Sequence, residues 1–213
     1  MPGRFITFEG GEGAGKTTQL ARAAAWLRGQ GVEVTLTREP GGTPRAERLR
    51  EILLERGSEA MPQSCELLLM FAARATHLEN LVRPAVSRGA WVLCDRFTDA
   101  TYAYQGGGRG MPVAQIDALV RIVHPDLQPD RTLLLDAPVD TGLARARQRN
   151  GDGGPDRFEA EQREFFERVR AVYLERARSE ADRFRVIDAT RAVDEVTAEV
   201  CASLEPLLRR GAP

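Results

Sequence analysis

Blocks of apolar residues recur along the chain, and five short runs of them predict β-strands. The run at 90–94 is nearly unbroken and ends in Asp95-Arg96, which is typical of a strand buried on both faces of a sheet. The expected strands are the run from Phe5 up to Gly10, Val32–Thr37, Ala90–Cys94, Arg131–Asp136 and Phe184–Asp188.

Between these runs, apolar residues recur at intervals of three and four, which predicts helices. In the first helix Leu20, Ala23 and Leu27 share one face, and Gly31 is expected to end it. The expected helices are Gln19–Leu27, Thr43 or Pro44 to Leu54, Gln63–Arg88 with Pro84 able to bend it, Val113–Val123, Thr141–Arg149, Phe158 to about Ala181, and Val193–Leu208. Residues 105–112 are expected to form a loop.

Strands and helices alternate throughout, so the sequence predicts an α/β fold with a parallel sheet of about five strands and helices on both faces. A chain of 213 residues is expected to form one domain, residues 1–213. Its net charge of -1 argues against a nucleic acid or a membrane as partner. Three widely spaced cysteines, with no apolar leader, predict reduced thiols and a cytoplasmic location.

The first predicted strand leads directly into Gly10-x-x-x-x-Gly15-Lys16-Thr17, and a predicted helix follows. In a P-loop, which needs this order, backbone N–H groups surround the phosphates, Lys16 reaches the β- and γ-phosphates, and Thr17 holds Mg²⁺. A glycine-rich hairpin or linker is the alternative interpretation. The residues predicted to bind ATP are Gly10, Gly11, Glu12, Gly13, Ala14, Gly15, Lys16, Thr17 and Thr18.

The distribution of basic residues supports the P-loop. Lys16 is the only lysine among the 30 basic residues, and the others are arginine. A compact ammonium on a flexible stem suits a phosphate site, where a planar guanidinium would not serve equally well. Phosphoryl transfer depends mainly on positioning and on stabilising charge, so Lys16, Mg²⁺ and arginines suffice.

Several sequence strings together resemble those of bacterial thymidylate kinases over nearly the whole chain. They are FEGGEGAGKTT at 8–18, TREPGGT at 37–43 with Arg50 downstream, FAAR at 71–74, CDRF and AYQGGGRG between 94 and 110, and DRFE at 156–159. The resemblance implies a P-loop kinase that transfers the γ-phosphate of ATP, bound with Mg²⁺, to thymidine 5'-monophosphate (dTMP), giving dTDP. It also implies a homodimer, for which the helix Gln63–Arg88 is a candidate surface.

The resemblance assigns roles at the phosphates. Arg96 is expected to grip the acceptor phosphate with Arg38 and Arg50, and Asp95 to hold Mg²⁺ with Thr17. Asp136, which also ends a predicted strand, is interpreted as structural. Family members of this type supply a catalytic arginine from a lid, here about 145–157. Its arginines are Arg145, Arg147, Arg149 and Arg157, with Arg149 the first choice.

The resemblance also assigns the base and sugar contacts. Phe71 is expected to stack on the pyrimidine, while Arg74, Thr101 and Gln105 bond its carbonyl edge and so favour thymine over cytosine. Tyr104 would crowd a ribose 2'-OH, and Glu12 would accept a hydrogen bond from the sugar 3'-OH. Many family members have the aromatic residue four positions before the arginine, where this chain has Met70, and often have serine at the position of Ala100.

Two alternative functions stay open at this point. The first is a kinase for another deoxynucleoside monophosphate such as dUMP, because a methyl group changes binding by only about 1–3 kcal/mol. The second is an ATPase switch module. It is disfavoured, since a GTPase would need an Asn-Lys-x-Asp motif and a deviant P-loop partition ATPase a further lysine, and the chain has only Lys16.

Overall fold

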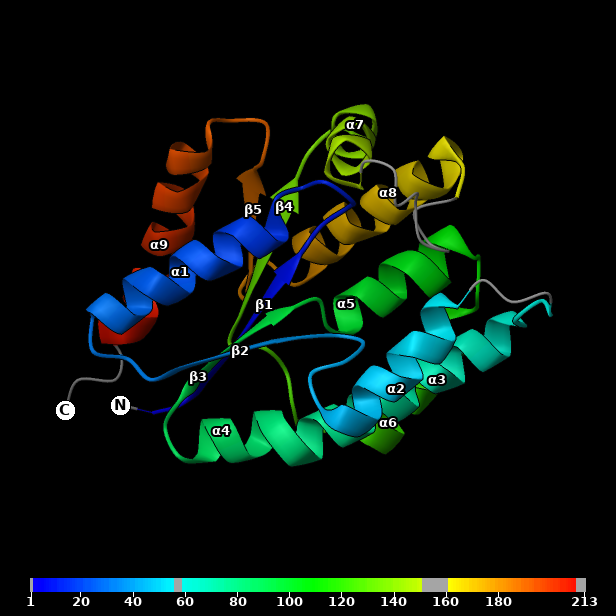
Figure 1. The fold of residues 1–213 in the computed structure, drawn as a ribbon, viewed down its shortest axis with the longest axis horizontal. Helices are drawn as coiled ribbons and strands as arrows, with labels where there is room; N and C mark the ends of the chain where they lie inside the picture. Colours follow the sequence, from blue (N-terminus) through cyan, green and yellow to red (C-terminus); the bar gives the residue numbers. More distant parts are fainter. Residues whose placement is uncertain (1, 56–58, 151–160, 210–213) are drawn as a thin grey trace.

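The computed structural model describes residues 2–55, 59–150 and 161–209. In this part of the chain, five parallel strands form one sheet in the order β2-β3-β1-β4-β5 (Figure 1). The strands are β1 (Arg4–Glu9), β2 (Val34–Arg38), β3 (Trp91–Asp95), β4 (Arg131–Asp136) and β5 (Phe184–Asp188). The predicted α/β fold with a parallel sheet is confirmed, and β4 and β5 have the predicted bounds.

Helices follow most of the strands. They are α1 (Lys16–Gly29), α2 (Pro44–Leu54), α3 (Gln63–His77), η1 (Leu78–Val82), α4 (Arg83–Ser87), α5 (Thr98–Thr101), η2 (Tyr102–Gly108), α6 (Val113–Val123), α7 (Val139–Asn150), α8 (Arg163–Ser179) and α9 (Val193–Arg209). As expected, α1 stops just before Gly31, which has a φ of +78°. The N–H groups of Gly31 and Val32 bond back to the carbonyls of Arg28 and Leu27, which closes the helix end.

The helices cover both faces of the sheet, because side chains along a strand alternate between its faces. Ile6 and Phe8 of β1 pack in one core cluster with residues of α1 and α9. Phe5, which points to the opposite face, packs with Leu78, Val82 and residues of α4. Figure 1 shows α1 and α9 on one side of the sheet and α5 and α8 on the other.

The predicted long helix 63–88 is three helical segments. α3 is followed by a π-helical turn, η1, and then by α4, in which Pro84 lies in the first turn. Proline has no N–H to donate and its ring collides with the carbonyl four residues earlier, so the regular α-helical pattern gives way just before it. In place of a simple bend at Pro84, the helix therefore forms the wider π-helical turn η1 immediately before it.

The loop predicted at 105–112 is partly wrong. Residues 105–108 belong to the π-helix η2, which continues α5. Gly107 and Gly108 let η2 lie against α8, since a Cβ at Gly107 would be 2.6 Å from Val172 Cγ2. Packing on α8 thus overrides the low helix propensity of glycine. No helix in the described residues combines the length and apolar character needed to span a membrane.

Candidate active site

The carboxyl edge of the sheet carries the glycine-rich loop. β3 pairs in parallel with both β1 and β2, so Asp95 and Arg38 lie at the same edge as the loop that leaves β1. The loop turns at Gly10, Gly13 and Gly15, whose φ angles are +137°, +65° and +89°. Only glycine adopts such angles readily, so these positions give the loop the curvature of a P-loop.

Lys16 lies at the start of α1, whose first turn has no side-chain cap and so offers N–H groups to an anion. Its Nζ donates hydrogen bonds to the carbonyls of Gly10 (3.0 Å) and Gly11 (2.8 Å). Burial, together with the positive charge of Arg96, lowers the pKa of the Lys16 ammonium. A phosphate at this position would neutralise that charge and replace the carbonyl contacts.

Thr17 and Asp95, the two residues predicted to hold Mg²⁺, lie side by side. Thr17 Oγ1 donates to Asp95 Oδ2 at 3.3 Å, across the entrance of the loop. The described residues contain no group of three or more His, Cys, Asp or Glu side chains arranged for a metal. Two oxygen side chains fit Mg²⁺, which binds through one or two protein ligands and takes the rest from water and substrate phosphates.

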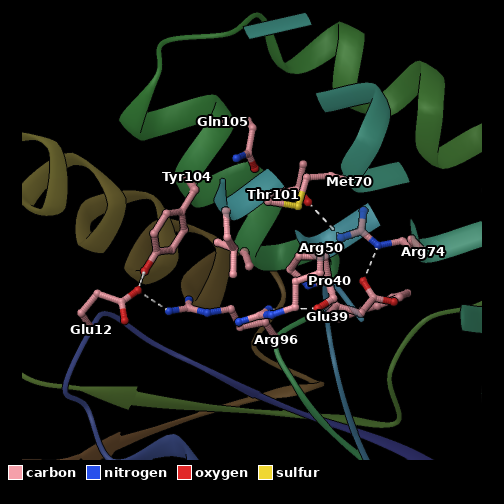
Figure 2. A pocket seen from close by; sticks show the side chains of 13 residues that line it. Glu12, Glu39, Pro40, Arg50, Met70, Arg74, Arg96, Thr101, Tyr104 and Gln105 are labelled. Atoms are coloured by element: carbon pink, nitrogen blue, oxygen red, sulfur yellow. Dashed lines mark hydrogen bonds and ion pairs between the residues drawn. The ribbon is translucent and has the colours of Figure 1, made fainter. Parts of the chain in front are cut away.

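Two adjoining cavities open beside this loop. One, of about 460 Å³, is lined by Glu12 to Thr18, Arg38, Asp95 and Arg145. The second, of about 130 Å³, lies between α2, α3 and η2 (Figure 2). Four residues line both cavities, and they are Glu12, Glu39, Arg50 and Arg96. The first is called the phosphate cleft and the second the base cavity below.

Arg96 stands at the boundary between the two cavities. It is the only described non-glycine residue with a positive φ, +70°, and its N–H donates to the Phe8 carbonyl. Nη1 donates to Gly10 O (3.0 Å) and Nη2 to Glu12 Oε1 (2.6 Å), and the guanidinium lies 4.7 Å from the Tyr104 ring centre. A left-handed backbone costs a non-glycine residue about 1–3 kcal/mol, and such conformations cluster at functional sites.

Glu12 and Tyr104 close one end of the base cavity. The Tyr104 hydroxyl donates to Glu12 Oε1 at 2.7 Å, the same oxygen that Arg96 contacts (Figure 2). Burial raises the pKa of Tyr104 well above its usual value, so its hydroxyl stays a donor at neutral pH. The three predicted residues are therefore brought together as one hydrogen-bonded group.

Arg74 closes the opposite end of the base cavity. Its Nε donates to Glu39 Oε2 (2.7 Å) and its Nη2 to Thr101 Oγ1 (2.9 Å). His77 Nδ1, 2.8 Å from Glu39 Oε1, holds the carboxylate from behind. The remaining nitrogen, Nη1, is buried without a hydrogen-bond partner in the described structure. Leaving such a donor unpaired is costly, and an acceptor bound beside Arg74 in the cavity would satisfy it.

Phe71 does not line the base cavity. It is only 2% exposed and packs in the core with Leu67, Met111 and Ile116. The Arg74 guanidinium lies 4.6 Å from its ring centre, so Phe71 supports that arginine from behind. The predicted stacking of Phe71 on a base is not supported by this geometry.

Met70 occupies the position that Phe71 was expected to fill, and it lines the cavity with other apolar residues: Pro40, Leu54, Phe97 and Ala100. Residues 70 and 74 are four apart and share a helix face, whereas residue 71 is turned about 100° from residue 70, toward the core. The sequence did carry a signal for Met70, because many family members have their aromatic residue four positions before the arginine, which is position 70 in this chain.

Gln105 lines the cavity from η2, and its amide nitrogen donates to Glu66 Oε1 at 2.8 Å. Thr101, one turn earlier, is 2% exposed and also lines it. Glu39, Pro40 and Leu54 complete the wall of the cavity. The sequence did not predict them as site residues, because only the fold brings the loop after β2 and the end of α2 close to η2.

The predicted phosphate-binding arginines differ in position. Arg50 lines both cavities and donates to the Pro40 carbonyl (2.9 Å). Arg38 lines the phosphate cleft alone and pairs with Glu47 (2.8 Å). Arg145 on α7 also lines that cleft. The side chain of Arg149 and residues 151–160, which include Arg157 and most of the predicted lid, lie outside the described residues.

Glu9 is a buried carboxyl group that the sequence analysis did not single out. It follows the apolar residues of β1, accepts hydrogen bonds from Phe97 N (2.7 Å) and the Tyr173 hydroxyl (2.8 Å), and is fully buried. Burial, and then the nearby Asp99 carboxylate, raise its pKa to about 8. Glu9 therefore ties the end of β1 to α8 and to the residue after Arg96. Asp136 pairs with Arg170 (2.7 Å), in agreement with a structural role.

A P-loop joined through shared arginines to a second, base-sized cavity defines the class of P-loop kinases that phosphorylate nucleoside monophosphates. The family model described as thymidylate kinase matches residues 8–200. The chain belongs to the thymidylate kinase family.

Similar proteins and structures support this membership. The chain is 58% identical over 208 residues to the thymidylate kinase of Pseudomonas syringae pv. syringae (strain B728a), covering 98% of each chain. It is 55% identical over 208 residues to that of Ectopseudomonas mendocina (strain ymp), again covering 98% of each. The crystal structure of thymidylate kinase from Ehrlichia chaffeensis matches with a TM-score of 0.77 and 34% identity, covering 96% of this chain and 99% of that one.

Proposed function

We propose that this chain transfers the γ-phosphate of ATP to dTMP to give dTDP, with ATP in the phosphate cleft and dTMP in the base cavity. The observation that carries the proposal is that Glu12, Glu39, Arg50 and Arg96 line both cavities. A base held at Arg74 would direct its sugar and phosphate toward these residues, where the end of the ATP chain also arrives. Donor and acceptor phosphates would meet there.

At the donor phosphates, Lys16 and the N–H groups at the start of α1 would bind the nucleotide. Mg²⁺, held through Thr17 and Asp95, would neutralise charge on the ATP phosphates. The acceptor phosphate is already ionised at neutral pH, so no protein base is required. Arg96, fixed by Gly10 and Glu12, would supply positive charge at the transferring group. Arg149 is proposed as the catalytic arginine that the lid supplies to the transferring phosphoryl group.

At the acceptor, Arg50 and Arg96 would clamp the phosphate, with Arg38 contributing from the cleft side. A guanidinium can donate two parallel hydrogen bonds to two phosphate oxygens, so it orients the phosphate as well as balancing its charge. The Glu12 and Tyr104 pair would bind the deoxyribose, and the ring of Tyr104 would leave little room for a 2'-hydroxyl.

At the base, Arg74 Nη1 is the donor that lacks a partner, and a carbonyl oxygen of thymine would satisfy it. Met70 would pack on one face of the ring. Cytosine has an amino group where thymine has that carbonyl, so it would leave Arg74 unsatisfied and set two donors against each other.

We further infer a homodimer and a cytoplasmic location. Leu68 on α3 is 58% exposed and Ile122 on α6 is 76% exposed, and these neighbouring helices offer apolar surface to a second copy. The three unpaired cysteines are compatible with a reducing compartment. Sedimentation analysis would test the dimer, and a monomer at micromolar concentration would contradict it.

The decisive experiment measures ADP release from ATP and Mg²⁺ with dTMP, dUMP, dCMP, dGMP or UMP as acceptor. We expect dTMP to give the highest kcat/KM. Turnover led by dUMP would favour the alternative acceptor, since one methyl group separates the two bases. ATP consumption that does not depend on any acceptor would instead indicate an ATPase module and refute the proposal.

A further inference from the structure

Glu66 is a buried carboxylate behind the base cavity, in the first turn of α3. It is 1% exposed and does not line the cavity. Its Oε1 accepts a hydrogen bond from Gln105 Nε2 (2.8 Å), and its Oε2 lies 3.5 Å from Arg109 Nη2. Arg109 also pairs with Glu161, just before α8 begins. The amide of Gln105 is therefore held from behind by a charged network.

The chemistry of this contact decides which end of the amide meets the carboxylate. An amide can turn about its last bond and exchange its oxygen with its nitrogen, and the two orientations offer opposite hydrogen bonds. A carboxylate beside the Arg109 guanidinium only accepts hydrogen bonds. The nitrogen of Gln105 must therefore face Glu66, and its oxygen is left for the cavity, where Figure 2 shows the amide.

We propose that Glu66 is a specificity-determining positioning residue, which fixes Gln105 as a hydrogen-bond acceptor for the base. The proposal rests on the assignment of the base cavity to dTMP. The wall of the cavity then carries a donor, Arg74 Nη1, and an acceptor, Gln105 Oε1. Thymine presents the matching pair, the carbonyl at C4 and the N–H at N3. Cytosine presents an amino group and a lone pair, so it is mismatched at both positions.

From the sequence, Gln105 was predicted to donate a hydrogen bond to the carbonyl edge of the base. The Glu66 contact reverses that role, and a second buried carboxylate, Glu39, orients the neighbouring donor Arg74. A buried carboxylate thus orients each of the two side chains proposed to contact the base: Glu39 orients Arg74, and Glu66 orients Gln105.

The test compares Glu66→Gln with Glu161→Gln. Glutamine at position 66 can donate or accept, so Gln105 can take either orientation, whereas Glu161→Gln removes a carboxylate from Arg109 and leaves the Gln105 contact intact. For Glu66→Gln we expect the ratio of Ki for dCMP, measured as a competitor, to KM for dTMP to fall about tenfold, with kcat within twofold of the wild type. We expect no such change for Glu161→Gln.

An unchanged dTMP preference in Glu66→Gln, or an equal loss in Glu161→Gln, would overturn the proposal. If Glu66→Gln alone does not fold, the swapped pair Glu66→Gln with Gln105→Glu, which restores one amide and one carboxylate at this contact, is tested instead. A carboxylate at 105 can only accept, so the dTMP preference should be retained, and its loss would refute the role of Glu66. Failure of the wild-type enzyme to use dTMP would be a separate result, against the proposed function itself.

Discussion

Arg96 lines both the phosphate cleft and the base cavity with one side chain. Its left-handed backbone turns the residue after Asp95 back toward the glycine-rich loop, where Gly10 and Glu12 receive the guanidinium. Asp95 faces Thr17 at the same strand end. Under the proposed function these two consecutive residues would serve opposite charges, Asp95 the metal ion and Arg96 the phosphate oxygens.

Lys16→Met should abolish turnover and leave the fold unchanged. The methionine side chain keeps the length of the stem but removes the buried positive charge of the phosphate cleft. Loss of such a charge typically lowers kcat by about 10²–10³-fold or more. The measurement is ADP release with dTMP, alongside a thermal melt. Arg48→Ala, an exposed residue outside both the phosphate cleft and the base cavity, serves as the control. Normal turnover in the Lys16 variant would exclude the P-loop assignment.

Met70 and Phe71 are adjacent but should behave differently when truncated. Met70→Ala removes an apolar wall of the base cavity, so the KM for dTMP should rise about tenfold with little loss of stability. Phe71→Ala opens a hole in the core and should lower the free energy of unfolding by about 3–5 kcal/mol. Denaturant unfolding and steady-state kinetics of both variants measure this. A larger KM effect from Phe71→Leu than from Met70→Ala would restore Phe71 as the stacking residue.

Among the elements, those set by local patterns were predictable. The strands β3, β4 and β5 are short runs bounded by polar residues, and the glycine-rich loop needs a strand before it and a helix after it. The helical state of η2 was not predictable, because three consecutive glycines disfavour a helix until α8 packs against them. The contact of Glu66 with Gln105 also depends on helix packing between segments distant in sequence.

The close packing of η2 on α8 makes a prediction at Gly108. A Cβ there would lie 2.6 Å from Phe165 Cζ, whereas a Cβ at Gly106 would be 3.5 Å from Ile116 Cδ1, an ordinary contact. Gly108→Ala should push η2 away from α8 and displace Gln105 and the other cavity residues of this helix. We expect an increased KM for dTMP and a lower melting temperature.

Gly106→Ala is the matched control for this variant, since it makes the same chemical change in the same helix without the collision. It should leave both the KM and the melting temperature near those of the wild type. Equal effects of the two substitutions would show that backbone flexibility, not the fit of η2 on α8, is what the glycines provide.

At the scale of the whole molecule, buried ionisable side chains join the layers of the fold. Glu9 connects the end of β1 with α8 through Tyr173 and with the residue after Arg96 through Phe97 N. Asp99 accepts hydrogen bonds from Arg176 of α8 and from Arg183, just before β5. The active-site edge is thus held by groups whose protonation contributes to global stability.

Glu9 predicts how the stability of the protein depends on pH. Its pKa is raised from 4.5 to about 8 in the folded state, chiefly by burial, so the folded protein keeps a proton that the unfolded chain releases near pH 4.5. The stabilisation is complete below the unfolded pKa and is lost as the pH rises through about 8. Burial lowers the pKa of His124 to about 4, which acts in the opposite direction below about pH 6.5.

The window from pH 6.5 to 8 lies above the range in which His124 acts, and comparison with a Glu9 variant isolates the contribution of Glu9. There the free energy of unfolding should fall with pH, by at most about 1.4 kcal/mol per unit. Glu9→Gln keeps the size of the side chain and can still accept from Phe97 N, but it carries no titrating proton, so its stability should be flatter over this range. Urea unfolding of both proteins at several pH values tests this. Parallel slopes would mean that Glu9 is ionised in the folded protein, with Arg96 compensating its charge.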